Sequence, residues 1–245
     1  MSLTLAIDIG NTRVKCGLFL GKNLEEFRVF ERGEEGLFFN WITEIKYEKS
    51  ILATVRKNTD PFLLKIQSLM QPVRFDGLSK LPIHLSYQTP ETLGQDRIAA
   101  LCGAYFLHPE NNILLVNAGS CVTIDLLEAN GTFLGGNIAP GMKMRWKAMH
   151  EFTGRLPLVE FAEVGDQVLG NDTTSALRLG VIKGILHEIR GYFTELHSKY
   201  SFLKCVMTGG DAPQLIRHSK MEIIEEPYLV LHGLNQILIA NEKTT

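Results

Sequence analysis

The sequence of 245 residues is long enough for one large domain or two compact ones, each with its own hydrophobic core. Hydrophobic residues make up 45% of it and charged residues 21%, proportions typical of a globular protein rather than a disordered one. The formal net charge of −2, without any basic run, argues against a nucleic-acid partner, because such binding depends on an excess of positive charge.

The first predicted element is a β-hairpin between Thr4 and Phe19. An apolar strand leads to Asp8, Gly10 and Asn11, and a second apolar strand follows. The turn comes directly after a buried strand, so its polar groups are expected at one end of a sheet. Asn and Gly are also the preferred residues of ordinary hairpin turns, so a purely structural hairpin remains an alternative to a functional one.

Strand and helix patterns alternate through the rest of the first half. Ser50–Val55 is predicted to form a short strand, and Arg97–Leu107 has the apolar period of a helix. Another helix is expected over Asp60–Met70, with Asp60 as the N-cap and Pro61 at the first helical position.

The second half opens with a hairpin of the same design, Ile113–Leu127, whose turn region carries Asn117, Gly119 and Ser120. Two such hairpins, about a hundred residues apart, indicate two domains of similar design. A long helix, a strand that leads into a Thr-Gly-Gly turn, and a C-terminal helix are then predicted at Thr173–His197, Lys204–Thr208 and Leu229–Ala240.

Strands and helices mixed in this way predict an α/β architecture. We place the domain boundary near Asn111 and Asn112, which divides the chain into residues 1–111 and 112–245. No stretch rich in Pro, Gly or Ser marks a linker there.

The N-terminal stretch reaches Asp8 too soon for a signal peptide, and no apolar run approaches the roughly 18 residues that cross a bilayer. The four cysteines form no CxxC pair and no zinc-finger spacing with histidine, so we interpret them as free thiols, mostly buried. These features predict a cytoplasmic protein without a membrane partner.

The first hairpin carries groups suited to phosphoryl transfer, in which catalysis depends on positioning and charge neutralisation. A carboxylate such as Asp8 at a strand end can hold Mg²⁺, which prefers oxygen ligands. Asn11, Thr12 and the turn amides can donate hydrogen bonds to phosphates, and Lys15 can reach one. Neither a Walker A loop nor a Rossmann G-x-G-x-x-G motif is present.

Further motifs follow in a fixed order along the chain: Tyr87–Pro90 with Gly94–Arg97, then Asn137–Gly141, Gly170–Thr173 and Thr208–Gly210. Together with D-x-G-N-T at Asp8–Thr12 and the second hairpin, this order resembles the sugar kinase, Hsp70 and actin superfamily. Within that superfamily it is similar to the type III pantothenate kinase family, whose motifs read Y-x-N-P, G-A-D-R, I-x-P-G and G-x-N-T.

The resemblance implies an α/β fold of two ribonuclease H-like (actin-like ATPase) domains with an interdomain cleft. The implied activity is ATP-dependent phosphorylation of pantothenate to 4'-phosphopantothenate, the first step of coenzyme A biosynthesis. ATP, Mg²⁺ and a monovalent cation (K⁺ or NH₄⁺) are the implied cofactors, and a homodimer is the implied assembly.

The resemblance also implies roles for individual residues. Asp96 would be the general base that takes the proton from the primary hydroxyl of pantothenate, and Asp8 would hold Mg²⁺. The ATP site would comprise Asp8, Ile9, Gly10, Asn11, Thr12, Arg13, Val14, Lys15 and Ser120. The substrate site would comprise Tyr87, Gly94, Gln95, Asp96, Arg97 and Thr173, the last from a partner subunit or a nearby helix.

Structural alternatives stand beside the roles of three of these residues. Asp96 could be a helix N-cap and Arg97 a solvated cation, and without the resemblance we would prefer that interpretation. Thr173 could cap the long helix that begins there, and the two roles of Thr173 are compatible.

The chain departs from the family pattern at several positions. Asn117 stands where the family usually carries an Asp that binds the activating monovalent cation, so we expect lower K⁺ affinity and an altered or absent cation requirement. Gln95 replaces the usual Ala beside the proposed base, Thr89 replaces Asn, and Cys121 replaces Ala.

Two other functions are considered. A transcription regulator that kept this fold without kinase activity stays open as an alternative because of Asn117, whereas the charge balance opposes direct contact with DNA. A kinase of the same superfamily could instead act on another hydroxylated substrate, which Tyr87 and the Gly94–Arg97 segment argue against.

Overall fold

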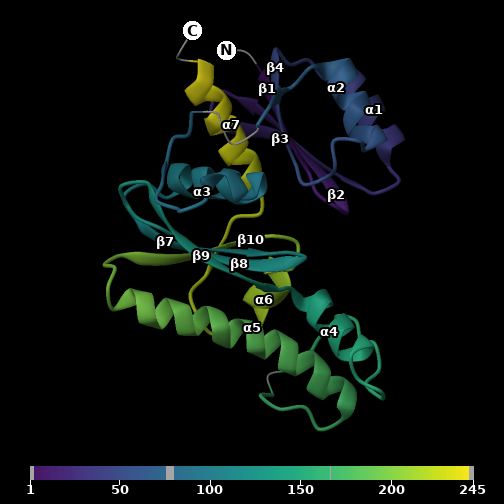
Figure 1. Cartoon of the computed structure of the whole chain (residues 1–245), viewed down its shortest axis with the longest axis vertical. Coiled ribbons are helices and arrows are strands. Elements are labelled where there is room, and N and C mark those ends of the chain that lie inside the picture. Colours follow the sequence, from purple (N-terminus) through teal and green to yellow (C-terminus); the bar gives the residue numbers. More distant parts are fainter. Residues whose placement is uncertain (1–2, 76–79, 166, 243–245) are drawn as a thin grey trace. The chain divides into compact units, whose positions relative to one another are not determined.

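The computed structural model describes residues 3–75, 80–165 and 167–242 and divides the chain into two compact units (Figure 1). The first unit combines residues up to 109 with residues from 228 onward, and the second contains residues 110–227. Each unit has its own β-sheet with helices packed on it.

The sheet of the first unit has the strand order β3-β2-β1-β4-β5. Strand β1 (Leu3–Ile9) pairs antiparallel with β2 (Arg13–Leu20), which pairs antiparallel with β3 (Asn23–Glu31). On its other side β1 pairs parallel with β4 (Lys49–Thr54), and β5 (Val73–Arg74) continues the parallel half. The predicted first hairpin and the strand after it are confirmed.

Helices α1 (Glu35–Glu44) and α2 (Pro61–Met70) pack on this sheet through an aromatic and aliphatic cluster. Helix α2 begins as predicted. The Asp60 carboxylate accepts hydrogen bonds from the backbone N–H groups of Phe62 at 2.9 Å and Leu63 at 3.2 Å. The N-cap prediction is therefore confirmed at atomic detail.

Helices α3 (Gln95–Leu107) and α7 (Leu229–Glu242) complete the first unit, with β6 (His84–Leu85) and the 3₁₀ turn η1 (Pro90–Thr92) preceding α3. The two helices cross closely at a pair of glycines. A Cβ atom on Gly233 would lie 1.7 Å from the Ala99 carbonyl oxygen, and one on Gly103 would lie 2.1 Å from the Leu229 carbonyl oxygen. Only glycine permits backbones to approach this closely.

This crossing corrects part of the predicted domain division. The predicted boundary near Asn111 lies close to the observed one, but residues 228–242, which were expected in the second half, belong to the first unit. The buried Asn235 of α7 also accepts a hydrogen bond from the Thr4 hydroxyl on β1 at 2.8 Å. Packing between segments at opposite ends of the chain leaves no signal in local sequence patterns.

The second unit repeats the strand arrangement of the first, with the order β11-β10-β7-β8-β9. Its strands are β7 (Asn112–Ala118), β8 (Cys121–Leu127), β9 (Thr132–Pro140), β10 (Leu203–Thr208) and β11 (Ile224–Glu225). The pairs β7–β8 and β8–β9 are antiparallel, whereas β7, β10 and β11 are parallel. The prediction of two halves of like design is confirmed at the level of strand order and direction.

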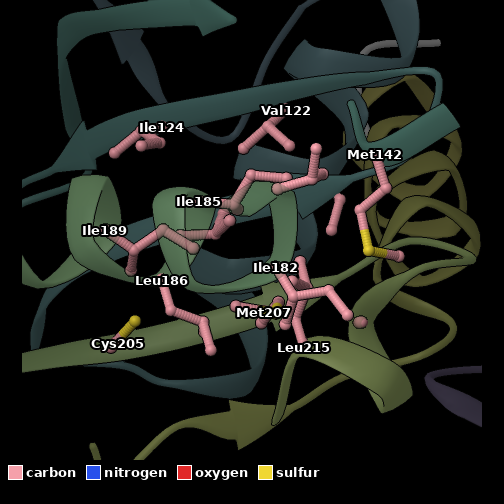
Figure 2. Close-up of a cluster of buried hydrophobic side chains, with 14 of the residues drawn as sticks. Val122, Ile124, Met142, Ile182, Ile185, Leu186, Ile189, Cys205, Met207 and Leu215 are labelled. Atoms are coloured by element: carbon pink, nitrogen blue, oxygen red, sulfur yellow. The ribbon is translucent and has the colours of Figure 1, made fainter. Parts of the chain in front are cut away.

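Helices α4 (Met142–Glu151), α5 (Thr173–His197) and α6 (Ala212–Arg217) pack on this second sheet. Helix α5 has the bounds predicted from its apolar period. Figure 2 shows how Ile182, Ile185 and Ile189 of this helix meet residues of β8 and β10 such as Val122 and Met207. This core fixes the strands that carry the second hairpin.

Two further predictions concern the thiols and the membrane. Cys16, Cys102 and Cys205 are free and buried, as predicted, whereas Cys121 is free and exposed at the start of β8. Burial raises the pKa of the Cys205 thiol to about 12, so this sulfur behaves as a small apolar group. Among the helices that the structure describes, none has the length and apolar character to cross a membrane.

Candidate active site

Asp8 lies near the end of β1, directly opposite Lys15 on β2. The carboxyl group is half-buried, and burial raises its pKa from 3.8 to about 6. The Lys15 ammonium acts in the opposite direction, and the negative charge of Asp96 raises the pKa further. The structure therefore brings Asp8, Lys15 and Asp96 together in the first unit.

Asp96 lies in the first turn of α3, but it is not the N-cap. Gly94 occupies the N-cap position, and the Asp96 carboxylate accepts a hydrogen bond from the backbone N–H of Arg97 at 2.9 Å. A Cβ atom on Gly94 would lie 2.6 Å from Asp96 Oδ1, so a side chain there would displace the carboxylate. The N-cap interpretation of Asp96 is wrong.

Arg97 is buried, with 6% of its surface exposed, although it carries a charge. Its guanidinium carbon lies 6.0 Å from the centroid of the Tyr87 ring, within the range of a cation–π contact. The interpretation of Arg97 as a solvated cation is therefore wrong. Tyr87 precedes η1 and Arg97 follows it, so two residues that were predicted to bind substrate are in contact.

Gln95 joins the start of α3 to the sheet. Its side-chain Oε1 accepts a hydrogen bond from the backbone N–H of Thr54, at the end of β4, at 3.1 Å. The Thr54 hydroxyl in turn donates to the carbonyl of Ile9 at 3.3 Å. A bulkier residue than the family's usual Ala thus links the end of β4 with the segment that holds Asp96.

The predicted ATP-binding segment divides into buried and exposed parts. Ile9 and Val14 are core residues, so only their backbones could contact a phosphate. Asn11–Arg13 forms the exposed turn, and Arg13 is already paired with Glu31 at 2.7 Å. Asn11 and Thr12 are therefore the turn residues best able to meet a ligand.

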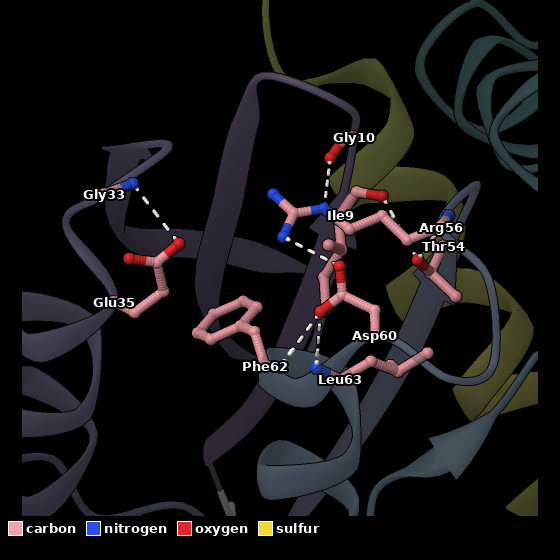
Figure 3. Close-up of polar contacts among 9 residues, drawn as sticks. All are labelled: Ile9, Gly10, Gly33, Glu35, Thr54, Arg56, Asp60, Phe62 and Leu63. Atoms are coloured by element: carbon pink, nitrogen blue, oxygen red, sulfur yellow. Dashed lines mark hydrogen bonds and ion pairs between the residues drawn. The ribbon is translucent and has the colours of Figure 1, made fainter.

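Sequence reasoning missed one residue at this turn, Arg56. Its Nε–H donates to the carbonyl of Gly10 at 2.8 Å, and its Nη1 lies 3.5 Å from Asp60 Oδ2 (Figure 3). A signal was available, because Arg56 follows β4, the parallel partner of β1. The ends of parallel neighbours meet at one edge of a sheet, which is the edge that carries the turn.

In the second unit, Asn117 on β7 lies opposite Thr123 on β8. Ser120 is exposed in the turn between these strands, and its carbonyl accepts a hydrogen bond from the N–H of Gly141 at 3.1 Å. A Cβ atom on Gly141 would lie 2.1 Å from the carbonyl oxygen of Gly119. The Asn137–Gly141 motif thus packs tightly against the second hairpin turn.

The Thr208–Gly210 segment at the end of β10 packs beside the same hairpin turn. Gly209 has a positive φ of 106°, and the N–H of Asp211 donates to the carbonyl of Ala118 at 3.0 Å. Because β10 is the parallel neighbour of β7, its Thr208–Gly210 end reaches the sheet edge where β7 ends.

Thr173 is the exposed first residue of α5, and the capping interpretation of this residue is wrong. The N-cap is Asp172, whose carboxylate accepts hydrogen bonds from the N–H groups of Thr174 at 2.9 Å and Ser175 at 3.0 Å. Thr173 instead lines a groove of about 550 Å³ between α4 and α5. The other lining residues are Arg145, Met149, Leu156, Ala176, Leu177, Gly180 and Val181.

The predicted site residues therefore fall into two sets. The hairpin residues Asp8–Lys15, together with Tyr87 and Gly94–Arg97, belong to the first unit, and Asn117, Ser120 and Thr173 belong to the second. Each set gathers residues that are separated in sequence.

Comparison with known proteins adds independent findings. A family model described as type III pantothenate kinase matches residues 4–195. A type III pantothenate kinase of Bacteroides fragilis (strain YCH46) is 41% identical over 242 residues, which is 98% of each chain. One from Flavobacterium johnsoniae is 33% identical over 237 residues, covering 96% of each chain.

Solved structures agree on the fold. A Campylobacter jejuni protein named for the Baf family of transcriptional activators matches with a TM-score of 0.64 and 24% identity, covering 98% of this chain and 99% of the other. The activator of 2-hydroxyisocaproyl-CoA dehydratase from Clostridium difficile, solved with bound ADPNP, matches with a TM-score of 0.56 and 14% identity, covering 99% and 97%. The predicted α/β fold of the actin-like ATPase type is confirmed.

Proposed function

The chain belongs to the type III pantothenate kinase family, and we propose that it phosphorylates pantothenate with ATP, using Asp96 as the general base. The product is 4'-phosphopantothenate, formed in the first step of coenzyme A biosynthesis. The observation that carries the residue assignment is that Asp96 lies near enough to Asp8, within one unit, for its negative charge to raise the pKa of Asp8. A metal-binding carboxylate and a base that share a site suit phosphoryl transfer to an alcohol.

Asp96 has the environment of a base. One hydrogen bond from the Arg97 N–H orients its carboxylate, which leaves further lone pairs for a substrate hydroxyl. It lies in the first turn of α3, where the N-terminus of the helix carries partial positive charge. The proton passes from the primary hydroxyl of pantothenate to Asp96 as the hydroxyl oxygen attacks the γ-phosphorus of ATP, and the bond from that phosphorus to ADP breaks.

Asp8 fits Mg²⁺. Its carboxylate is half-buried, accepts no hydrogen bond from the residues that the structure describes, and lies near a second carboxylate. A divalent cation would relieve both the burial and the repulsion, and Mg²⁺ readily takes carboxylate oxygens together with water and phosphate. When bound, Mg²⁺ neutralises charge on the phosphate oxygens. Lys15 supplies a further positive charge on the neighbouring strand.

The remaining roles concern binding. The turn from Gly10 to Arg13 and the hydroxyl of Ser120 bind the phosphates of ATP. Arg97, held by Tyr87, binds an anionic group of the substrate, since a guanidinium suits carboxylate and phosphate oxygens. Gly94 and Gln95 line the same substrate site, and Thr173 contacts substrate from a homodimer partner or a nearby helix.

The cation requirement follows from Asn117. An amide oxygen can coordinate K⁺ or NH₄⁺ but carries no negative charge, so we propose a weak dependence on monovalent cations. The proposal also includes a cytoplasmic location, for a homodimeric enzyme that acts on small molecules.

A coupled assay with purified protein, ATP, Mg²⁺ and pantothenate tests this function, run with and without K⁺ or NH₄⁺. We expect ADP release that depends on pantothenate and changes little between cations. Absence of phosphorylated product under every cation condition, with folded protein, would reject the assignment and revive the regulator alternative. Turnover with a different alcohol in place of pantothenate would instead favour another substrate.

A further inference from the structure

The turn of the first hairpin is held open by a side chain from outside it. The Gly10 N–H donates to the Arg13 carbonyl at 2.9 Å, but within the described part of the chain the Arg13 N–H does not bond to the Gly10 carbonyl. That bond is the one that usually closes a tight turn. The Gly10 carbonyl accepts the Nε–H of Arg56 instead, at 2.8 Å (Figure 3).

Arg56 is itself held in place on several sides. Its Nη1 lies 3.5 Å from Oδ2 of Asp60, the carboxylate that caps α2, and its guanidinium carbon lies 5.6 Å from the centroid of the Phe62 ring. Only 9% of the side chain is exposed. The backbone N–H of Arg56 also donates to the Thr54 hydroxyl at 3.0 Å. The start of α2 and the end of β4 therefore fix the direction in which the guanidinium points.

Fixing the Gly10 carbonyl also fixes the amide that follows it. A trans peptide is planar, so the Gly10 carbonyl and the Asn11 N–H point in opposite directions; the described residues contain no cis peptide bond. With its carbonyl turned toward Arg56, this peptide directs the Asn11 N–H away from Arg56. Within the described residues that N–H has no hydrogen-bond partner, which leaves it available to a ligand.

We infer that Arg56 is a positioning residue for this turn, one that holds the Gly10–Asn11 peptide so that the Asn11 N–H binds the phosphate chain of a nucleoside triphosphate. The inference rests on the function proposed above for the turn. Arginine suits the task because its planar fork can hold the Gly10 carbonyl and the Asp60 carboxylate at once. Lysine has a single ammonium nitrogen, so it cannot hold the Gly10 carbonyl and the Asp60 carboxylate in the same fixed geometry.

Binding of ATP with Mg²⁺, measured by calorimetry in the absence of pantothenate, tests the inference. Arg56→Met removes both contacts and keeps an apolar stem over Phe62, and we expect ATP affinity to fall about tenfold or more. Arg56→Lys should recover part of the affinity. In steady-state assays KM for ATP should rise in Arg56→Met, while KM for pantothenate stays within about twofold of wild type.

The matched control is Arg74→Met, since Arg74 is an exposed arginine on β5 of the same sheet whose guanidinium bonds to the Asn58 side chain. This variant should bind ATP as wild type does. Asp60→Asn keeps a good N-cap residue but removes the charge that anchors Arg56, and a two- to threefold loss of ATP affinity is expected.

An Arg56→Met protein that is folded and binds ATP within twofold of wild type overturns the inference, as does a loss of thermal stability without a loss of affinity. If Arg56→Met fails to fold, wild-type ATP affinity in both Arg56→Lys and Asp60→Asn overturns it. Wild-type protein that binds ATP but makes no phosphopantothenate would contradict the proposed function alone. Wild-type protein that binds no ATP would overturn both.

Discussion

The two units have the same strand order and the same hairpin between their first two strands, yet the hairpins differ in charge. In the first, Asp8 lies opposite Lys15, and in the second Asn117 lies opposite Thr123. In both units the strand that runs parallel to the first hairpin strand ends near the hairpin turn; Arg56 lies two residues after β4, and Gly209 directly follows β10.

Under the function proposed above, charge neutralisation falls to the first unit, where carboxylates, Lys15 and Arg56 gather at one sheet edge. The second unit offers neutral hydrogen-bonding groups. Because Gly141 and Gly209 have no side chain, their backbones can pack against the turn of the second hairpin. Substitutions that alter charge should therefore have their largest effects in the first unit.

The largest effect is expected from Asp96→Asn. An amide cannot accept the substrate proton, so kcat should fall by about 100- to 10,000-fold. ATP affinity should stay near the wild-type value, because Asp96 acts on the alcohol. Steady-state kinetics and calorimetry measure the two quantities. Glu91→Gln, an exposed carboxylate on η1, serves as the control and should change neither; near-normal turnover in Asp96→Asn would remove Asp96 from its proposed role.

Asp8→Asn should lower Mg²⁺-dependent turnover by about 100-fold and also change the pH dependence of stability. The pKa of Asp8 is about 6 in the folded protein against 3.8 as the ordinary value. Between these values the folded state binds a proton that the unfolded state has lost, so the free energy of unfolding falls as pH rises through this window. Without Mg²⁺, the variant should be more stable than wild type above pH 6, by about 1–2 kcal/mol after allowance for partial exposure.

Urea unfolding at several pH values between about 3 and 7, without metal, measures this difference. The two proteins should become equally stable near pH 3, where Asp8 is mainly protonated in both states. Added Mg²⁺ should stabilise wild type and not the variant. A variant less stable than wild type at pH 7 would show that the charged carboxylate contributes favourable interactions in the absence of metal.

Asn117→Asp makes the second hairpin more like the first. A negative charge would be added opposite Thr123, whose buried hydroxyl has no partner among the described residues, and it should attract a monovalent cation. We expect K⁺ to stimulate this variant about five- to tenfold, with little stimulation of wild type. Rates in KCl against an equal concentration of a bulky ammonium chloride give the measurement. Asn130→Asp, in an exposed turn, is the matched control, and equal K⁺ responses in all three proteins would contradict the prediction.

The smallest effects are expected from the two turn hydroxyls, removed in Ser120→Ala and Thr12→Val. Each should raise KM for ATP about threefold, the value of one modest hydrogen bond. If the two hairpins bind phosphates independently, the double variant should show about the product of the single effects. Ser198→Ala, at the end of α5, controls for loss of a hydroxyl elsewhere. If KM for ATP rises in Thr12→Val and not in Ser120→Ala, the second hairpin contributes shape rather than hydrogen bonds to ATP binding.

Local patterns predicted much of the fold. Alternating apolar residues around a polar turn predicted both hairpins, and Asp60 followed by Pro61 predicted the start of α2 at the observed residue. Helix α5 has its predicted bounds because its apolar residues recur with helical period. Family motifs then indicated Asp8, Asp96 and Arg97 as site residues, although the caps at Gly94 and Asp172 were missed because several nearby residues could have filled the position.

Neighbouring residues and motifs in order were thus enough to predict both hairpins, the helices α2, α3, α5 and α7, the repeated design of the two halves and the family. The packing of α7 on α3, the burial of Arg97 beside Tyr87 and the hydrogen bond from Arg56 to the Gly10 carbonyl became evident only in the folded chain. Each of these contacts joins residues from different elements, and its energy depends on distance and burial that no single stretch of the chain specifies.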